Sequence, residues 1–80
     1  MFRRTLTPED IGRIVRNTRK AAGLRQDELA GAAGVGLRFL VDLERGKPTA
    51  QIGKALQVLQ VLGCSFEITP PPEAEDTKSK

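Results

Sequence analysis

The side chains of this 80-residue chain that could do chemistry are mostly charged, with 13 Lys and Arg and 10 Asp and Glu. The sequence contains no histidine and a single cysteine, Cys64. These counts exclude a zinc site, a histidine-dependent nucleophile and an internal disulfide. Cys64 is expected to pack as a small apolar residue. We therefore expect no enzymatic activity, no metal and no cofactor.

Positive charge is concentrated in the first part of the chain. Residues 1–63 hold 11 Lys and Arg against 6 Asp and Glu, whereas residues 64–80 hold 2 against 4. A basic body suits a polyanion, although a surplus of this size also occurs on ordinary solvated surfaces. The sequence has no apolar run of about 18 residues and no signal-peptide segment, so we expect a soluble cytoplasmic protein without a membrane partner.

Residues 26–46 predict two short helices joined by a tight turn. Gly34 offers a left-handed position that ends the first helix, and Gly46 ends the second. A helix, a glycine turn and a second helix form the helix-turn-helix unit, whose second helix enters the major groove of DNA. Helical hairpins also occur in bundles that bind nothing, so spacing alone leaves both interpretations open. The periodic apolar positions are Leu29, Ala30 and Ala33, then Phe39, Leu40 and Leu43.

A first helix is expected from about Pro8 to Ala22. Thr7 is the predicted N-cap, Pro8 takes the first helical position, and Gly23 is the predicted C-cap. Residues 1–6 are read as a flexible arm. The side of this helix expected to face the core carries Ile11, Ile14, Val15, Thr18 and Ala22.

A last helix is expected from about Ala50 to Leu62, with Thr49 as N-cap. Val58 and Val61 fall outside its main apolar stripe, which suggests that a partner subunit covers this second face. The positions expected to face the protein's own core are Ile52, Ala55, Leu56, Leu59 and Leu62.

The segment from Cys64 to Thr69 alternates apolar and polar residues, as a half-buried strand does. The sequence offers this strand no internal partner, so we expect an antiparallel ribbon between two subunits, with Phe66 and Ile68 facing the helices. An extended tail laid on the surface is the alternative. Residues 70–80 begin with three prolines and are expected to be disordered.

Three segments carry a family resemblance: Leu24-Arg-Gln-Asp-Glu-Leu-Ala, Ala33-Gly-Val and Leu43-Glu-Arg-Gly-Lys47. They resemble the Cro/C1-type (XRE) family of DNA-binding domains, over roughly residues 9–63. The expected fold is therefore mainly α: a four-helix, lambda-repressor-like helix-turn-helix domain over residues 7–69, with its dimerisation strand at 64–69.

The resemblance implies a role for individual positions. Leu37, Arg38 and Asp42 would face base edges, and Gln26, Gly36 and Lys47 would contact phosphates. Arg38 suits guanine, because a guanidinium can bond O6 and N7 together. We expect Asp42 to orient Arg38.

Two departures from the family pattern affect the helix starts. Arg25 and Gly36 stand where relatives usually have Ser or Thr, so the helix after Arg25 should be weaker by about 1 kcal/mol unless a neighbour caps it. Arg19 and Glu44 occupy the positions of a structural ion pair in this family.

The run from Leu43 to Ala50, the run from Gly53 to Leu59 and the alternation around Phe66 and Ile68 resemble HipB-type antitoxins. This resemblance implies a homodimer that binds a palindromic operator, represses its own operon and binds a HipA-like serine/threonine kinase toxin. Its dimer interface would use Val58, Val61, Phe66 and Ile68. A free-standing XRE-family regulator, and more weakly a protein-interaction module without DNA binding, remain the alternatives.

Overall fold

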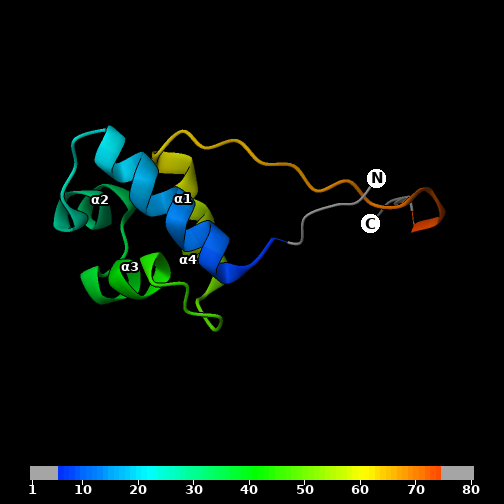
Figure 1. Cartoon of the computed structure of the whole chain (residues 1–80), viewed down its shortest axis with the longest axis horizontal. Coiled ribbons are helices and arrows are strands. Elements are labelled where there is room, and N and C mark those ends of the chain that lie inside the picture. The colour runs from blue at the N-terminus through cyan, green and yellow to red at the C-terminus, as the bar shows by residue number, and fades with distance from the viewer. Residues whose placement is uncertain (1–5, 75–80) are drawn as a thin grey trace.

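The computed structural model describes residues 6–74. Four helices gather around one core at one end of the molecule, and the segment after the fourth runs away from it (Figure 1). This arrangement confirms the expected four-helix fold. The helices are α1 (Pro8–Ala21), α2 (Gln26–Ala33), α3 (Leu37–Glu44) and α4 (Ile52–Val61).

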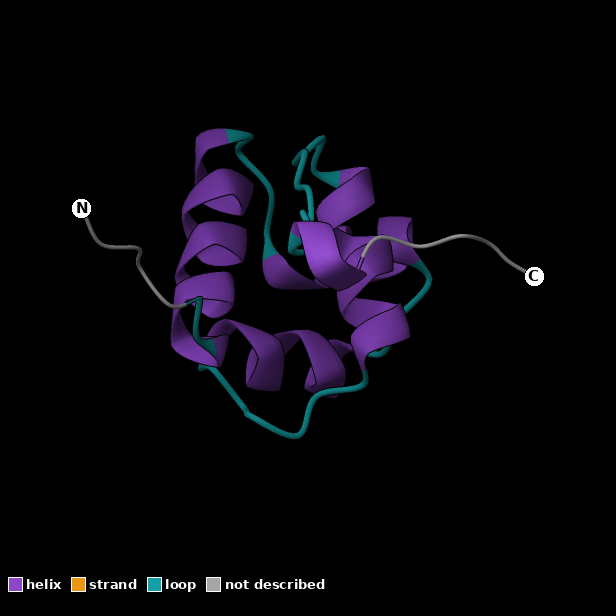
Figure 2. Ribbon diagram, turned by 90° about the vertical axis from the view of Figure 1, so that its right-hand side faces the viewer, coloured by secondary structure: helices purple, strands orange, loops and turns teal. Residues whose placement is uncertain are grey.

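Each of the four helices contributes to one apolar core, which they enclose as Figure 2 shows. α3 packs against both α1 and α2, while α4 packs against α2. Burial of these side chains is the main favourable term in folding. Because α3 is held from two sides, its remaining side faces solvent. The core residues are Val15, Leu29, Ala30, Ala33, Leu40, Leu43, Ala55, Val58 and Leu59.

The start of α1 is capped as the sequence predicts. The Thr7 hydroxyl accepts from the Asp10 N–H at 3.1 Å, and the Asp10 carboxylate accepts from the Thr7 N–H at 3.0 Å. A hydrogen bond from Arg13 and those from Thr7 lower the pKa of Asp10 below its ordinary value. The helix ends at Ala21, so the exposed Ala22 lies outside it and does not face the core as expected.

The start of α2 has no side-chain cap from Arg25, and a neighbour compensates in part. The Glu28 carboxylate accepts from the Arg25 backbone N–H at 2.8 Å. The Arg25 guanidinium also bonds Asp27 at 3.1 Å, which lowers the pKa of Asp27. The absent cap therefore leaves the position of the helix start unchanged, since α2 begins at Gln26 as predicted.

The turn between α2 and α3 depends on Gly34, whose φ of +70° is left-handed. L side chains rarely adopt this conformation, which glycine reaches without steric cost. The next residue, Val35, donates its N–H to the Ala30 carbonyl at 3.0 Å. From α4, the Gln57 amide donates to the Ala33 carbonyl at 3.0 Å. The end of α2 is thereby closed before α3 begins.

The expected start of α4 was wrong, and so was part of its expected inward face, although Ala55 and Leu59 are buried as expected. A turn closes from the Ala50 N–H to the Lys47 carbonyl, and Gln51 stays extended, so the helix starts at Ile52 and Thr49 is not its cap. Val58 is fully buried in the chain's own core, whereas Ile52 is 73% exposed and Leu56 38% exposed. Apolar residues surround much of this helix, and packing against α2 selects the buried side.

Residues 64–71 form neither helix nor strand in the described part of the chain. Cys64 packs against the core as expected, but Phe66 is 55% exposed and Ile68 88% exposed, so neither faces the chain's own helices. A strand needs a ladder partner, and one chain supplies none here. Pro72–Ala74 forms a single 3₁₀ turn where disorder was expected. Residues 1–5 and 75–80, which belong to the expected arm and tail, lie outside the described residues.

At Gly12 the backbone of α1 lies close to the end of α3. A Cβ atom at Gly12 would lie 2.5 Å from the Leu43 carbonyl oxygen and 2.7 Å from that of Glu44. Both neighbours are backbone atoms, which cannot move aside as a flexible side chain can. The absence of a side chain at this position therefore sets the distance between the two helices.

We expect Gly12→Ala to destabilise the fold by about 1–3 kcal/mol, because overpacking forces the backbone of α3 to shift. Urea unfolding followed by circular dichroism, at one protein concentration, measures the change. Gly31→Ala is the matched control, since a Cβ at that helical glycine meets no atom within 4 Å. The control should be stabilised by about 0.4–1 kcal/mol, because alanine leaves the unfolded chain fewer conformations than glycine does. Equal midpoints for the two variants would contradict the close approach.

Candidate nucleic-acid interface

A buried ion pair joins α1 to the end of α3. The Arg19 Nε donates to Glu44 Oε2 at 2.6 Å and its Nη2 donates to Oε1 at 3.0 Å. The third nitrogen, Nη1, donates to the Leu24 carbonyl at 2.9 Å. The hydrogen bonds to Glu44 raise the pKa of Arg19 despite the loss of hydration. The guanidinium therefore stays charged and ties together α1, α3 and the loop before α2.

Gln26 belongs to the same network. Its Nε2 donates to Glu44 Oε1 at 3.1 Å, so the amide is held by the carboxylate that also binds Arg19. This hydrogen bond uses one N–H of the Gln26 amide. The amide also has a second N–H donor and a carbonyl acceptor, which a ligand could bind. The first residue of α2 is thus fixed relative to α3, in a polar hollow that both helices line.

The exposed side of α3 begins with Leu37 and Arg38. Leu37 is 49% exposed. The Arg38 side chain is 80% exposed. Gly36, the N-cap of this helix, is also exposed, and a Cβ there would meet nothing within 4 Å. The N-terminal end of α3 is therefore open to a large partner.

Asp42 lies between two cations. Its Oδ1 is 3.5 Å from Arg38 Nε and its Oδ2 is 3.7 Å from Lys47 Nζ. Exposed ion pairs of this kind contribute only about 0–1 kcal/mol. Arg38 can therefore leave Asp42 for another acceptor at small cost.

The structure brings Arg38, Asp42 and Lys47 together and places Gln26 at the other flank of α3. Sequence reasoning did not select Arg45 or Lys54 as site residues, although both border this surface. Arg45 directly follows α3, so its position was available from the helix boundary. Lys54 comes from α4 and lies 5.8 Å from the centre of the Phe39 ring. No local sequence pattern predicts that Lys54 lies near Phe39, because the tertiary fold brings the two residues together.

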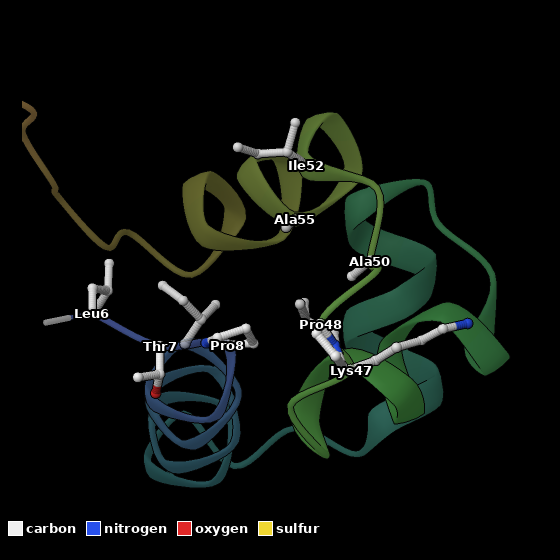
Figure 3. Close-up of a pocket in the computed structure, with 10 residues that line it drawn as sticks. Leu6, Thr7, Pro8, Lys47, Pro48, Ala50, Ile52 and Ala55 are labelled. Carbon is white, nitrogen blue, oxygen red and sulfur yellow. The ribbon is translucent and has the colours of Figure 1, made fainter.

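A separate hollow of about 270 Å³ lies between the start of α1 and the start of α4 (Figure 3). Its lining is mostly apolar, with Leu6 and Pro8 on one side and Ala50 and Ile52 on the other. Lys47 borders it, but its amine points away (Figure 3). The other polar residue of the lining is Thr7, whose hydroxyl caps the start of α1.

The described residues contain no cluster of three or more potential metal ligands. Among residues 6–74, no helix is long and apolar enough to cross a membrane. The exposed polar groups around α3 are mostly cations and hydrogen-bond donors, with the partly exposed Asp42 among them. Groups of this kind can neutralise phosphates and bond base edges, as DNA recognition requires.

Comparison with known proteins agrees with this geometry. Residues 15–68 match the family model described as helix-turn-helix. An HTH-type transcriptional regulator of Sinorhizobium fredii, y4mF, is 70% identical over 73 residues, which cover 91% of this chain and 96% of the relative.

Solved structures share the fold. A HipB–O4 20mer complex superposes with a TM-score of 0.73 at 20% identity, over 86% of this chain and 97% of that chain. A HipA–HipB–O2–O3 complex gives 0.73 at 22% identity, over 96% and 100%. The chain therefore belongs to the helix-turn-helix family of XRE-type transcriptional regulators, a family that binds DNA and is not enzymatic.

Proposed function

We propose that the chain is a sequence-specific, operator-binding repressor that acts in the cytoplasm as the antitoxin of a HipA-like serine/threonine kinase and represses its own operon. Leu37 and Arg38 read base edges, with Asp42 orienting Arg38. Gln26, Gly36 and Lys47 contact phosphates. Repression follows because a bound dimer blocks access to the promoter that its operator overlaps.

The observation that carries the DNA-binding proposal is the open N-terminal end of α3. Arg38 has an 80% exposed side chain, and within residues 6–74 its one ion pair is with the partly exposed Asp42. Guanine offers the same guanidinium two acceptors, O6 and N7, in the major groove. The Gln26 amide is fixed by Glu44 at one flank, and Lys47 lies at the other. Arg38, as a base-reading group, would thus lie between two phosphate-binding groups, as the major groove lies between two sugar-phosphate backbones.

The antitoxin part of the proposal is supported by the extent of the fold match. The HipB chain of a HipA–HipB–O2–O3 complex is matched over its whole length and over 96% of this chain. The free-standing regulator is the second candidate, because the relative with 70% identity is described only as a transcriptional regulator. The two candidates share the DNA interface and differ in the kinase partner.

A second copy of the chain completes the proposal. Val61 is 46% exposed and the apolar residues of segment 64–69 are largely exposed, whereas the fully buried Val58 is not available to a partner. Antiparallel pairing of this segment across a two-fold axis would give its unpaired backbone groups partners. The dimer would then present two copies of α3 to successive turns of one duplex.

The DNA interface is tested by fluorescence anisotropy with a labelled palindromic fragment from upstream of the gene. Replacing both Arg38 and Gln26 by Ala should nearly abolish binding, because a base contact and a phosphate contact are lost together. Wild-type affinity should fall steeply with salt. Lys20→Ala, which removes an exposed charge outside the site, is the control. Wild-type affinity in the double variant would refute these roles.

The dimer is tested by sedimentation at micromolar concentration. The wild-type chain should sediment as a dimer, and replacing both Phe66 and Ile68 by Ser should give a monomer, because the apolar side of the ribbon is lost. Glu67→Gln changes the opposite side of the same segment and should leave the dimer intact. A monomeric wild type would contradict the ribbon.

The kinase partner is tested by co-expressing a tagged chain with the product of the neighbouring reading frame. The antitoxin proposal expects a stoichiometric complex with a kinase-like protein, and relief of its growth arrest. Operator binding without any such complex, or a gene that stands alone, favours the free-standing regulator.

A further inference from the structure

Two polar hollows border α3, one at each flank. The first, which we call the α1–α2 hollow, measures about 360 Å³ and is lined by Arg16, Gln26, Val41, Glu44 and Arg45. The second, the α3–α4 hollow, measures about 280 Å³, and its polar lining includes Arg38, Asp42, Lys47, Thr49 and Lys54. Arg16, Arg45, Thr49 and Lys54 have no part in the function proposed above.

The α1–α2 hollow carries uncompensated positive charge. Its one carboxylate, Glu44, is only 3% exposed and is bonded twice by Arg19. Across the described part of the chain, neither Arg16 nor Arg45 forms an ion pair. With Arg19 neutralising Glu44, two guanidiniums remain available to an anion at this hollow.

The α3–α4 hollow has the same excess. Arg38, Lys47 and Lys54 surround the single carboxylate of Asp42, which leaves two positive charges over. Lys54 lies over the Phe39 ring, with Nζ 5.8 Å from its centre. The ring limits where this flexible amine can go without neutralising it. The Thr49 hydroxyl adds a neutral donor at the same hollow.

The two hollows lie on different sides of α3. With about 3.6 residues per turn, Val41 and Glu44 project to one flank of the helix, and Phe39 and Asp42 project to the other. The major groove is bounded by the two sugar-phosphate backbones and is wide enough to admit a helix, so a helix within it has one backbone on each side. Each hollow therefore faces a different DNA strand when α3 lies in the groove.

We infer that each hollow receives one backbone phosphate: Arg16 and Arg45 hold the phosphate of one strand, and Lys54 and Thr49, beside Lys47, hold that of the other. This inference rests on the proposed function. It assigns Arg16, Arg45 and Lys54 to affinity and leaves sequence preference to Leu37 and Arg38. Neutralising charge on both strands also fixes how deeply and at what angle α3 enters the groove.

The test compares an operator fragment with a scrambled duplex of equal length over a series of salt concentrations. One variant replaces both Arg16 and Arg45 by Ala, and another replaces Lys54 by Ala. Each variant should lose affinity for the operator and for the scrambled duplex by the same factor. Each lost phosphate contact should reduce the slope of log affinity against log salt by about one. Arg38→Ala should instead lower the ratio of operator to scrambled affinity.

Two controls separate charge position from total charge and from folding. Lys20→Ala removes one positive charge, as Lys54→Ala does, but outside both hollows, and should keep the wild-type slope. Lys54→Arg should also keep it by retaining the cation. Urea midpoints confirm that each variant is folded. Wild-type binding with unchanged slopes in the hollow variants would overturn the inference and leave the proposed function standing. A changed operator preference in those variants would also overturn it. A wild type that binds neither duplex would refute the proposed function itself.

Discussion

The ion pair between Arg19 and Glu44 is the contact on which the orientation of α3 depends. It is almost fully buried and bidentate, and Glu44 also accepts from Gln26, so one carboxylate fixes the relative positions of three helices. Breaking such a pair leaves a buried charge without a partner, which typically costs about 3–5 kcal/mol. The apolar core alone would not specify this register, because packing tolerates small rotations better than a two-bond ion pair does.

The polar groups around this pair divide into rigid and adjustable sets. Gln26 is held by a network whose other members are buried, whereas among the described residues Arg38 and Lys47 are each paired with the partly exposed carboxylate of Asp42 alone. A rigid group suits a contact that every DNA sequence offers, since phosphates recur at constant spacing. An adjustable group suits a base edge, whose donors and acceptors differ from one base pair to the next.

Local signals in the sequence were sufficient for four helices, for the glycine turn and for the cap at Thr7, because each depends on a few neighbouring residues. The buried side of α4 was not predictable in this way. Its apolar residues lie on more than one face, and contact with α2 decides that Val58 is inside and Ile52 outside. The pair of Arg19 with Glu44 came from a family resemblance, since nothing local joins residues 25 positions apart. Lys54 approaches α3 only through the tertiary fold.

The contact at Gly12 has a consequence for the partner of α3. The backbone of α1 lies directly against the backbone of α3 there, with no side chain between them that could adjust its conformation. This close contact opposes a tilt of α3 against α1, so a misfit between the helix and the groove of a bound duplex would fall mainly on the nucleic acid. The energetic cost of bending or narrowing a duplex varies with its base steps, including steps that no side chain touches. A DNA-binding unit built in this way would discriminate between sites partly by how easily the DNA deforms.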